Sequence, residues 1–125
     1  MKELHKINQI SNFSKKWICK FSDPRIDYRE LVDCYFADEC DELGFVMDCG
    51  YSFSEKYGSA VHDQAALVRI INDVTDVQLL GSAIYSRWRY FNHWAYSGDE
   101  ILESQNREWF IVALNRLREL ALQNI

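Results

Sequence analysis

Hydrophobic residues recur along much of this chain at intervals of three and four, the spacing that places side chains on one face of an α-helix. The pattern begins in residues 3–21. Three polar residues, Ser11, Asn12 and Ser14, interrupt this stretch, so the pattern allows one frayed helix or two short ones.

A second helix is predicted to begin at Asp23-Pro24 and to run to about Leu43. Aspartate is a favoured N-cap, and proline suits the first helical position because its missing N–H would have no partner there. Gly44 is expected to end the helix as a glycine C-cap, with Phe45 making the apolar contact that accompanies such a cap. The apolar residues of this helix lie on one side: Tyr28, Leu31, Val32, Tyr35, Phe36, Cys40 and Leu43.

The stretch after Gly44 has the weakest pattern. The preferred interpretation is a connector followed by a short helix over residues 48–57. A small β-hairpin near residues 45–53, which would make the fold α+β, stays open as the alternative. A further helix is predicted from about Asp63 to Asn72.

Two capping signatures follow. Thr75 and Gln78 have the spacing of a capping box, in which the first residue caps a helix and the second reaches back to it. This signature predicts a helix over residues 76–95. Ser97 and Glu100 repeat the signature before the last helix.

The last helix is predicted over residues 104–123. Its apolar face consists of Trp109, Phe110, Ala113, Leu114, Leu117, Leu120 and Ala121. Its polar face consists of Asn115, Arg116, Arg118 and Glu119. Five or six helices with short connections predict an all-α bundle, and the length of 125 residues fits a single domain, residues 1–125.

The helix over residues 76–95 is apolar around much of its circumference. Its apolar side spans roughly 200°, about twice the stripe that a solvent-facing helix needs, so neighbours are expected on two sides. Trp88, Phe91 and Trp94 are therefore predicted to lie in the core, and Gly81 leaves a notch for a close neighbour.

The remaining arc of that helix is a candidate binding surface, which we call the polar ridge. It consists of Tyr85, Arg89, Asn92, His93 and Tyr96. The alternative is a half-buried rim in which Arg89 pairs with an acidic residue from positions 27–42.

Glu39 stands among the apolar residues of its helix. A carboxylate in such a place is costly unless it is paired. Arg87, at the edge of the other apolar arc, is the predicted partner in a buried ion pair. Partial exposure and a role as a catalytic acid are the alternatives.

Charge is unevenly distributed along the chain, whose net charge is −5. Residues 1–20 carry five lysines and one glutamate, whereas residues 21–63 carry eleven acidic and three basic residues. A general nucleic-acid-binding domain carries a basic excess, which this chain lacks. The acidic residues that form a candidate docking face are Asp33, Asp38, Asp41 and Glu42.

Metal and cofactor motifs are absent from the sequence. The four cysteines, at positions 19, 34, 40 and 49, contain no CxxC pair, so no metal and no cofactor is predicted. The first residues lack the apolar core of a signal peptide, and no apolar run approaches a membrane span. We therefore expect reduced cysteines, a cytoplasmic protein and no membrane partner.

Three functions are compatible with these patterns. The first is a non-catalytic helical protein that binds another protein, as an adaptor, accessory subunit or inhibitor of the immunity type. The second is nucleic-acid binding through Lys15, Lys16, Lys20 and Trp17. The third is a small enzyme or ligand-binding domain built on Tyr85, Arg89, His93 and Glu39, although no catalytic motif accompanies them. The sequence does not specify the oligomeric state.

Overall fold

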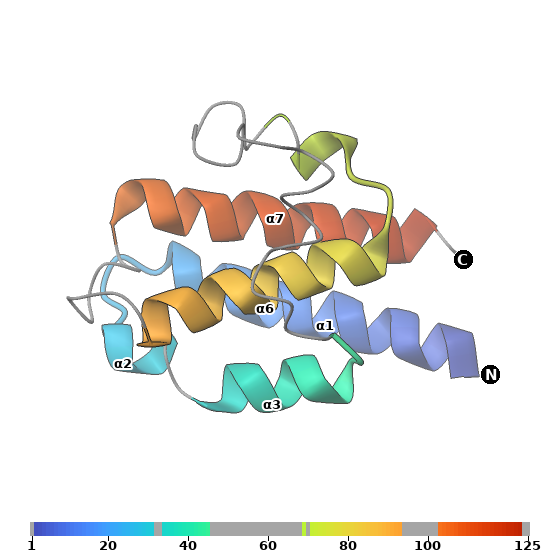
Figure 1. Ribbon diagram of the computed structural model, residues 1–125, viewed down its shortest axis with the longest axis horizontal. Coiled ribbons are helices and arrows are strands. Elements are labelled where there is room, and N and C mark those ends of the chain that lie inside the picture. Colours follow the sequence, from blue (N-terminus) through green and yellow to red (C-terminus); the bar gives the residue numbers. More distant parts are fainter. Residues whose placement is uncertain (1, 32–33, 46–68, 70, 94–102, 124–125) are drawn as a thin grey trace.

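The computed structural model of the chain describes residues 2–31, 34–45, 69, 71–93 and 103–123 (Figure 1). The described residues form five helices and no strand: α1 (Lys2–Ser22), α2 (Tyr28–Leu31), α3 (Cys34–Glu42), α6 (Val77–His93) and α7 (Ser104–Gln123). The predicted all-α fold is confirmed. The predicted hairpin and the short helix over residues 48–57 lie outside the described residues, apart from Phe45 itself.

The first and last of these helices lie side by side and run in opposite directions (Figure 1). Arg118 Nε of α7 donates to Ser11 Oγ of α1 at 3.3 Å, and Arg107 Nε donates to the Phe21 carbonyl at 2.9 Å. Arg107 therefore satisfies a carbonyl that the end of α1 would otherwise leave without a partner. Helix α6 packs on α7, and α3 packs on α6.

Aromatic side chains join α1, α3 and α6 in the core. Phe36 of α3 lies 4.9 Å from Trp17 and 5.2 Å from Trp88, measured between ring centroids. Phe13 of α1 lies 5.5 Å from the same Phe36 ring. Phe36 is fully buried, so its ring contacts attach α3 to both α1 and α6.

Helix α7 matches its predicted boundaries, and every residue of its predicted apolar face is buried. Helix α1 is continuous, which resolves the choice between one helix and two. Its interrupting serines are accommodated inside the bundle: Ser11 and Ser14 are both buried. Ser11 Oγ accepts the hydrogen bond from Arg118 of α7, so this polar residue is used in the packing of α1 on α7.

Two predicted helix starts are wrong. The helix predicted from Asp23 begins only at Tyr28, because Asp23 Oδ1 accepts the Arg25 N–H within a turn at 2.9 Å. Asp27 is the actual cap, and its Oδ1 accepts the Arg29 N–H at 2.9 Å. The described part of this predicted helix consists of α2 and α3, and residues 32–33 lie outside the described residues.

The start of α6 is also capped differently from the prediction. Asp76, not Thr75, is the N-cap, and its Oδ1 accepts the Leu79 N–H at 3.2 Å. Gln78 does not reach back to the cap, because its Nε2 donates to the Gly44 carbonyl at 2.7 Å. This bond ties the first turn of α6 to the end of α3.

Gly44 ends α3 as predicted. Its φ of 83° is in the left-handed region that glycine adopts without strain. The Phe45 N–H donates to the Cys40 carbonyl and the Gly44 N–H to the Asp41 carbonyl, both at 3.0 Å, which is the hydrogen-bond pair of a Schellman motif.

The motif directs Phe45 onto Gly81 of α6. A Cβ built on Gly81 would stand only 2.3 Å from carbons of the Phe45 ring. The predicted notch at Gly81 is therefore filled by a phenylalanine ring rather than by a helix.

In the described part of α6, some residues are buried that the helical periodicity of the sequence places on the polar side. Every residue from Leu80 to Ser86 is buried, and Trp88 is 1% exposed. These buried residues include Ser82 and Ser86, which the polarity of the sequence would place outside.

Candidate functional site

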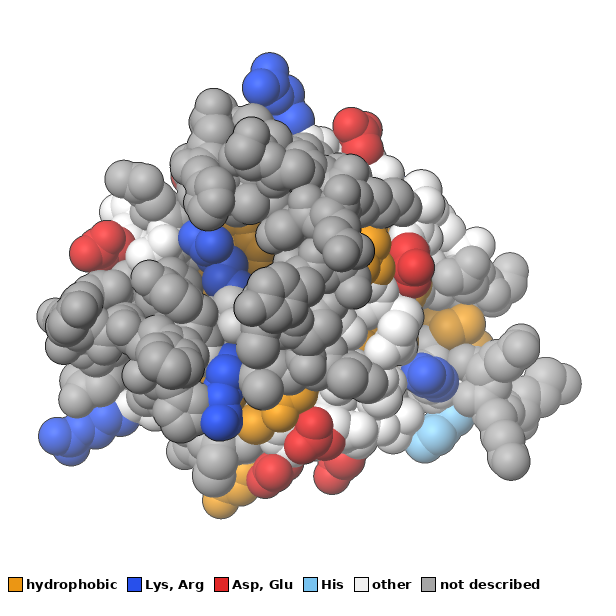
Figure 2. All heavy atoms as spheres, viewed as in Figure 1, with side chains coloured by type: hydrophobic (Ala, Val, Ile, Leu, Met, Phe, Trp, Pro, Cys, Tyr) orange, Lys and Arg blue, Asp and Glu red, His pale blue; other side chains and the backbone are white. Residues whose placement is uncertain are grey.

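The exposed side of α3 carries one tyrosine near its first turn and three acidic residues after it, and we call it the outer face of α3. It consists of Tyr35, Asp38, Asp41 and Glu42, all exposed. Figure 2 shows acidic side chains gathered along the lower edge of the molecule, where Figure 1 places α3. Asp33, the fourth acidic residue predicted for this face, lies outside the described residues.

Tyr35 was assigned by its apolar character to the buried side, and that prediction is wrong. Tyr35 is 65% exposed. At 3.6 residues per turn, Tyr35 and Glu42 lie roughly 20° apart on the helix, whereas Phe36 lies roughly 100° from Tyr35. The helical spacing of the sequence therefore indicates that Tyr35 is exposed, because Tyr35 shares its angular position with the acidic Glu42.

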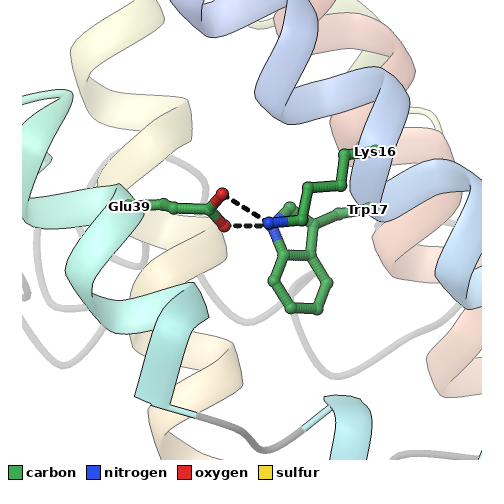
Figure 3. A network of polar contacts seen from close by, with 3 residues as sticks. All are labelled: Lys16, Trp17 and Glu39. Atoms are coloured by element: carbon green, nitrogen blue, oxygen red, sulfur yellow. Dashed lines mark hydrogen bonds and ion pairs between the residues drawn. The ribbon is translucent and has the colours of Figure 1, made fainter.

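Glu39 lies at the border between the two sides and fixes α3 to α1. Its Oε2 accepts the indole N–H of Trp17 at 2.7 Å, and its Oε1 accepts Lys16 Nζ at 2.6 Å (Figure 3). Its side chain is 28% exposed. The predicted ion pair with Arg87 is thus replaced by Lys16, because α1 is the helix that faces this border.

Arg87 lies elsewhere, at the contact between α6 and α7. Its guanidinium carbon stands 4.8 Å from the centre of the Trp109 ring, in cation–π geometry. Its Nη2 also lies 3.4 Å from Asn106 Oδ1. Arg87 therefore packs against α7 and has no place in a site with Glu39.

Acidic groups create a negative potential at the end of α3. Burial raises the pKa of the Cys40 thiol above its usual range, and the neighbouring Asp41 and Glu39 carboxylates raise it further. Burial also raises the pKa of Tyr85, as do the charge of Asp41 and a hydrogen bond to it, whereas Arg89 acts in the opposite direction. The same carboxylate thus affects two groups on two helices.

The polar ridge predicted on α6 is only partly described, and one of its members is misplaced. Tyr85 is 8% exposed and packs 6.3 Å from the Trp88 ring, so it belongs to the core. Arg89 is half-buried. Asn92 and His93 belong to α6, but their side chains lie outside the described part, as does all of Tyr96. Tyr85 is therefore not an exposed member of the polar ridge, and the rest of the ridge stays a prediction.

The residues predicted for nucleic-acid binding lie together on α1, but the Trp17 ring among them is not accessible. Trp17 is 1% exposed, and Lys16 and Lys20 lie over its ring at 5.3 and 5.6 Å. Stacking on a base requires an exposed ring, which Trp17 cannot supply. Lys15 is exposed, while Lys16 is engaged with Glu39.

The described part of the chain contains two free cysteines, the exposed Cys19 and the buried Cys40. Within the same residues, no group of three or more histidine, cysteine, aspartate or glutamate side chains is placed to hold a metal ion. None of the described helices is long and apolar enough to span a membrane.

Comparison with known proteins adds no relative: no family model, curated protein or solved structure matches this chain.

Proposed function

We propose that this protein acts by binding another protein, and that the outer face of α3 contacts a basic surface of that partner. The observation that carries the proposal is the 65% exposure of Tyr35, at the N-terminal end of a face that carries three exposed acidic residues. Tyrosine is among the residues that contribute most to binding at protein interfaces. Charges surrounding such a ring steer association and exclude unsuitable partners.

The placement of the acidic residues supports this role. Asp41 and Glu42 lie in the last turn of α3, and this helix contains no basic residue. Negative charges at a helix C-terminus oppose the helix dipole, at a cost of about 0.3–1 kcal/mol each. Helix stability therefore does not account for Glu42, whereas Asp41 also has a hydrogen bond with Tyr85. A positively charged partner would gain from both residues.

The face is also held in a fixed position. Glu39 attaches one border of α3 to α1, and the Schellman motif seats Phe45 on α6. A preorganised surface loses less conformational entropy when it binds. The free thiols of Cys19 and Cys40 suit a reducing compartment, so we place the interaction in the cytoplasm.

The proposal is tested by affinity capture from the native host with four versions of the protein. These are the parent, Tyr35→Ala, the double variant Asp38→Asn/Glu42→Gln, and Glu108→Lys. Glu108 is an exposed acidic residue of α7 and controls for the change in net charge. We expect one or more proteins captured by the parent and Glu108→Lys but lost with both outer-face variants.

Direct binding then identifies the contact. With the purified partner, the association rate should fall as salt is raised, because electrostatic steering is screened. Retention of the partner by both outer-face variants, each folded by circular dichroism, would overturn the proposal. Failure of the parent to capture any protein specifically would do the same.

A further inference from the structure

A second site, independent of the outer face of α3, lies at the end of the bundle where α1 and α6 begin and α7 ends. A pocket of about 480 Å³ is lined there by Lys6, Ile7, Ile10, Phe45, Val77, Gln78 and Ala121. Figure 1 shows the three helix ends meeting at this end of the molecule. Pockets that hold small molecules have volumes of roughly 300–1,000 Å³, so this one is large enough.

About half of the pocket wall is apolar. Ile7 and Ile10 are one helical turn apart on α1, and Val77 and Ala121 belong to α6 and α7. Ile7 and Val77 are only partly buried, so the packing of the bundle leaves apolar surface here that water must cover. Protein interiors are otherwise closely packed, and an apolar chain in this space would remove that surface from water.

One end of the pocket is positive. Lys6 is exposed, and its Nζ lies 3.8 Å from where a Cβ on Gly44 would stand, beside the corner that ends α3. Val77 and Gln78 are the first two residues of α6, whose N-terminus carries the positive end of the helix dipole. The exposed Asp76 carboxylate is the opposing charge, and it is already engaged by the Leu79 N–H.

We propose that this pocket binds a small amphipathic anion: a monocarboxylate with an unbranched apolar chain of medium length. The carboxylate pairs with Lys6 near the first turn of α6, and the chain lies along Ile7 and Val77, the apolar wall residues that are only partly buried. A neutral apolar molecule would leave the ammonium without a counter-charge, and a polar dianion would leave the wall exposed to water. The combination of one cation and an apolar wall selects a molecule that carries both parts.

The experiment titrates the full chain with decanoate, followed by calorimetry and by two-dimensional NMR of the backbone amides. Decan-1-ol tests the chain without the charge, and acetate tests the charge without the chain. Lys6→Gln removes the cation, and Lys15→Gln is the matched control because Lys15 is an exposed lysine on the same helix outside the pocket.

We expect decanoate to bind the parent and Lys15→Gln equally, with shifts in the amides of α1, α6 and α7 that line the pocket. Lys6→Gln should bind about fivefold more weakly, the size expected for loss of one solvent-exposed charge pair. Acetate should not bind measurably, and decan-1-ol should bind more weakly than decanoate.

Two filling variants test the location. Ala121→Leu and Ile7→Trp each place extra side-chain volume in the pocket, and each should weaken decanoate at least tenfold. Circular dichroism shows whether each variant is folded, and one folded variant is enough to test the location. The proposal is wrong if decanoate fails to bind the parent at millimolar concentration, if a folded filling variant binds it normally, or if Lys6→Gln binds it as tightly as the parent.

Discussion

Helices α6 and α3 differ in how much of their surface the bundle covers. In α6, seven consecutive residues from Leu80 to Ser86 are buried. In α3, Phe36 and Cys40 are fully buried while Tyr35 is 65% exposed. Tyr85 and Trp88 of α6 look like parts of a ligand site but lie in the core, whereas the shorter and less distinctive α3 presents the exposed ring. Residue type alone is therefore a poor guide to which aromatic side chain is available for binding.

The largest difference in stability is expected between the loss of a buried ring in α6 and the loss of an exposed ring in α3. Trp88→Ala removes a fully packed side chain of α6 and should lower the free energy of unfolding by about 3–5 kcal/mol. Tyr35→Ala on α3 should change it by less than about 0.5 kcal/mol, as exposed substitutions usually do. Urea titrations of both variants measure the difference. Equal midpoints would show that α6 is not the buried helix.

Gly81→Ala should be the next most damaging change. Its new methyl group would meet the Phe45 ring at 2.3 Å, so overpacking should cost about 1–3 kcal/mol. The double variant Gly81→Ala/Phe45→Ala should be more stable than the sum of the two single losses predicts, since the clash is then gone. Strict additivity in the same urea titrations would contradict this contact between α3 and α6.

Alkaline pH should weaken the junction between the two helices. Cys40 and Tyr85 both have pKa values raised above their ordinary values of 9.0 and 10.0, so the folded state favours their protonated forms. Their contribution to stability is complete below about pH 9 and is lost as pH rises, because the unfolded chain releases these protons first. Each group can lower the folding constant by up to about tenfold per pH unit in that range.

Urea midpoints between pH 7.5 and 10.5 measure this slope. Cys40→Ala should remove the part that begins near pH 9, and Tyr85→Phe the part that begins near pH 10. A slope that is unchanged in both variants would assign the alkaline loss to other groups.

The contacts of Glu39 at the border of α3 should contribute less to the stability of the protein. Glu39→Ala leaves the buried Trp17 indole N–H without its acceptor, and we expect a loss of about 1 kcal/mol, near the low end for such a group because water can reach this border. Glu39→Gln retains an acceptor oxygen and should cost less. Thermal melts compare the two, and equal losses would show that the ion pair with Lys16, which both substitutions remove, matters more than the indole bond.

The smallest effect is expected on the outer face of α3. Glu42→Gln removes a negative charge from the last turn and should stabilise the protein by a few tenths of a kcal/mol at low salt. The same change should weaken binding of a basic partner. A substitution that improves folding while it impairs binding distinguishes a functional acidic residue from a structural one. A clear loss of stability in urea titrations at low salt would instead assign Glu42 a structural role.

The sequence predicts most of the packing, because hydrophobic periodicity reports which residues share a helix face. The boundaries of α7 and the glycine cap at Gly44 follow from such local signals. Tyr85 shows the limit of the method. The angular position of Tyr85 around the helix puts it on the polar side. Whether Tyr85 is buried depends on how many helices surround α6, and the sequence of one helix does not give that number.

The candidate site was only partly predictable for a related reason. Competing aspartates decided the helix starts, since Asp27 and Asp76 offered better geometry than Asp23 and Thr75. The partner of Glu39 depended on which helix lies against α3, and sequence cannot distinguish Lys16 on one neighbour from Arg87 on another. Acidic composition indicated Asp38, Asp41 and Glu42, but the exposure of Tyr35 needed the structure.

The pairing of α1 with α7 has a consequence for the order of events during synthesis. The bond from Arg118 to Ser11 spans 107 residues, so α1 leaves the ribosome long before its neighbour exists. At about 5–20 residues per second, roughly 5–20 s pass before α7 is available. During this interval the side chains of α1 that α7 later covers have no helix of their own chain to pack on, and a chaperone that recognises apolar helices would find its target there.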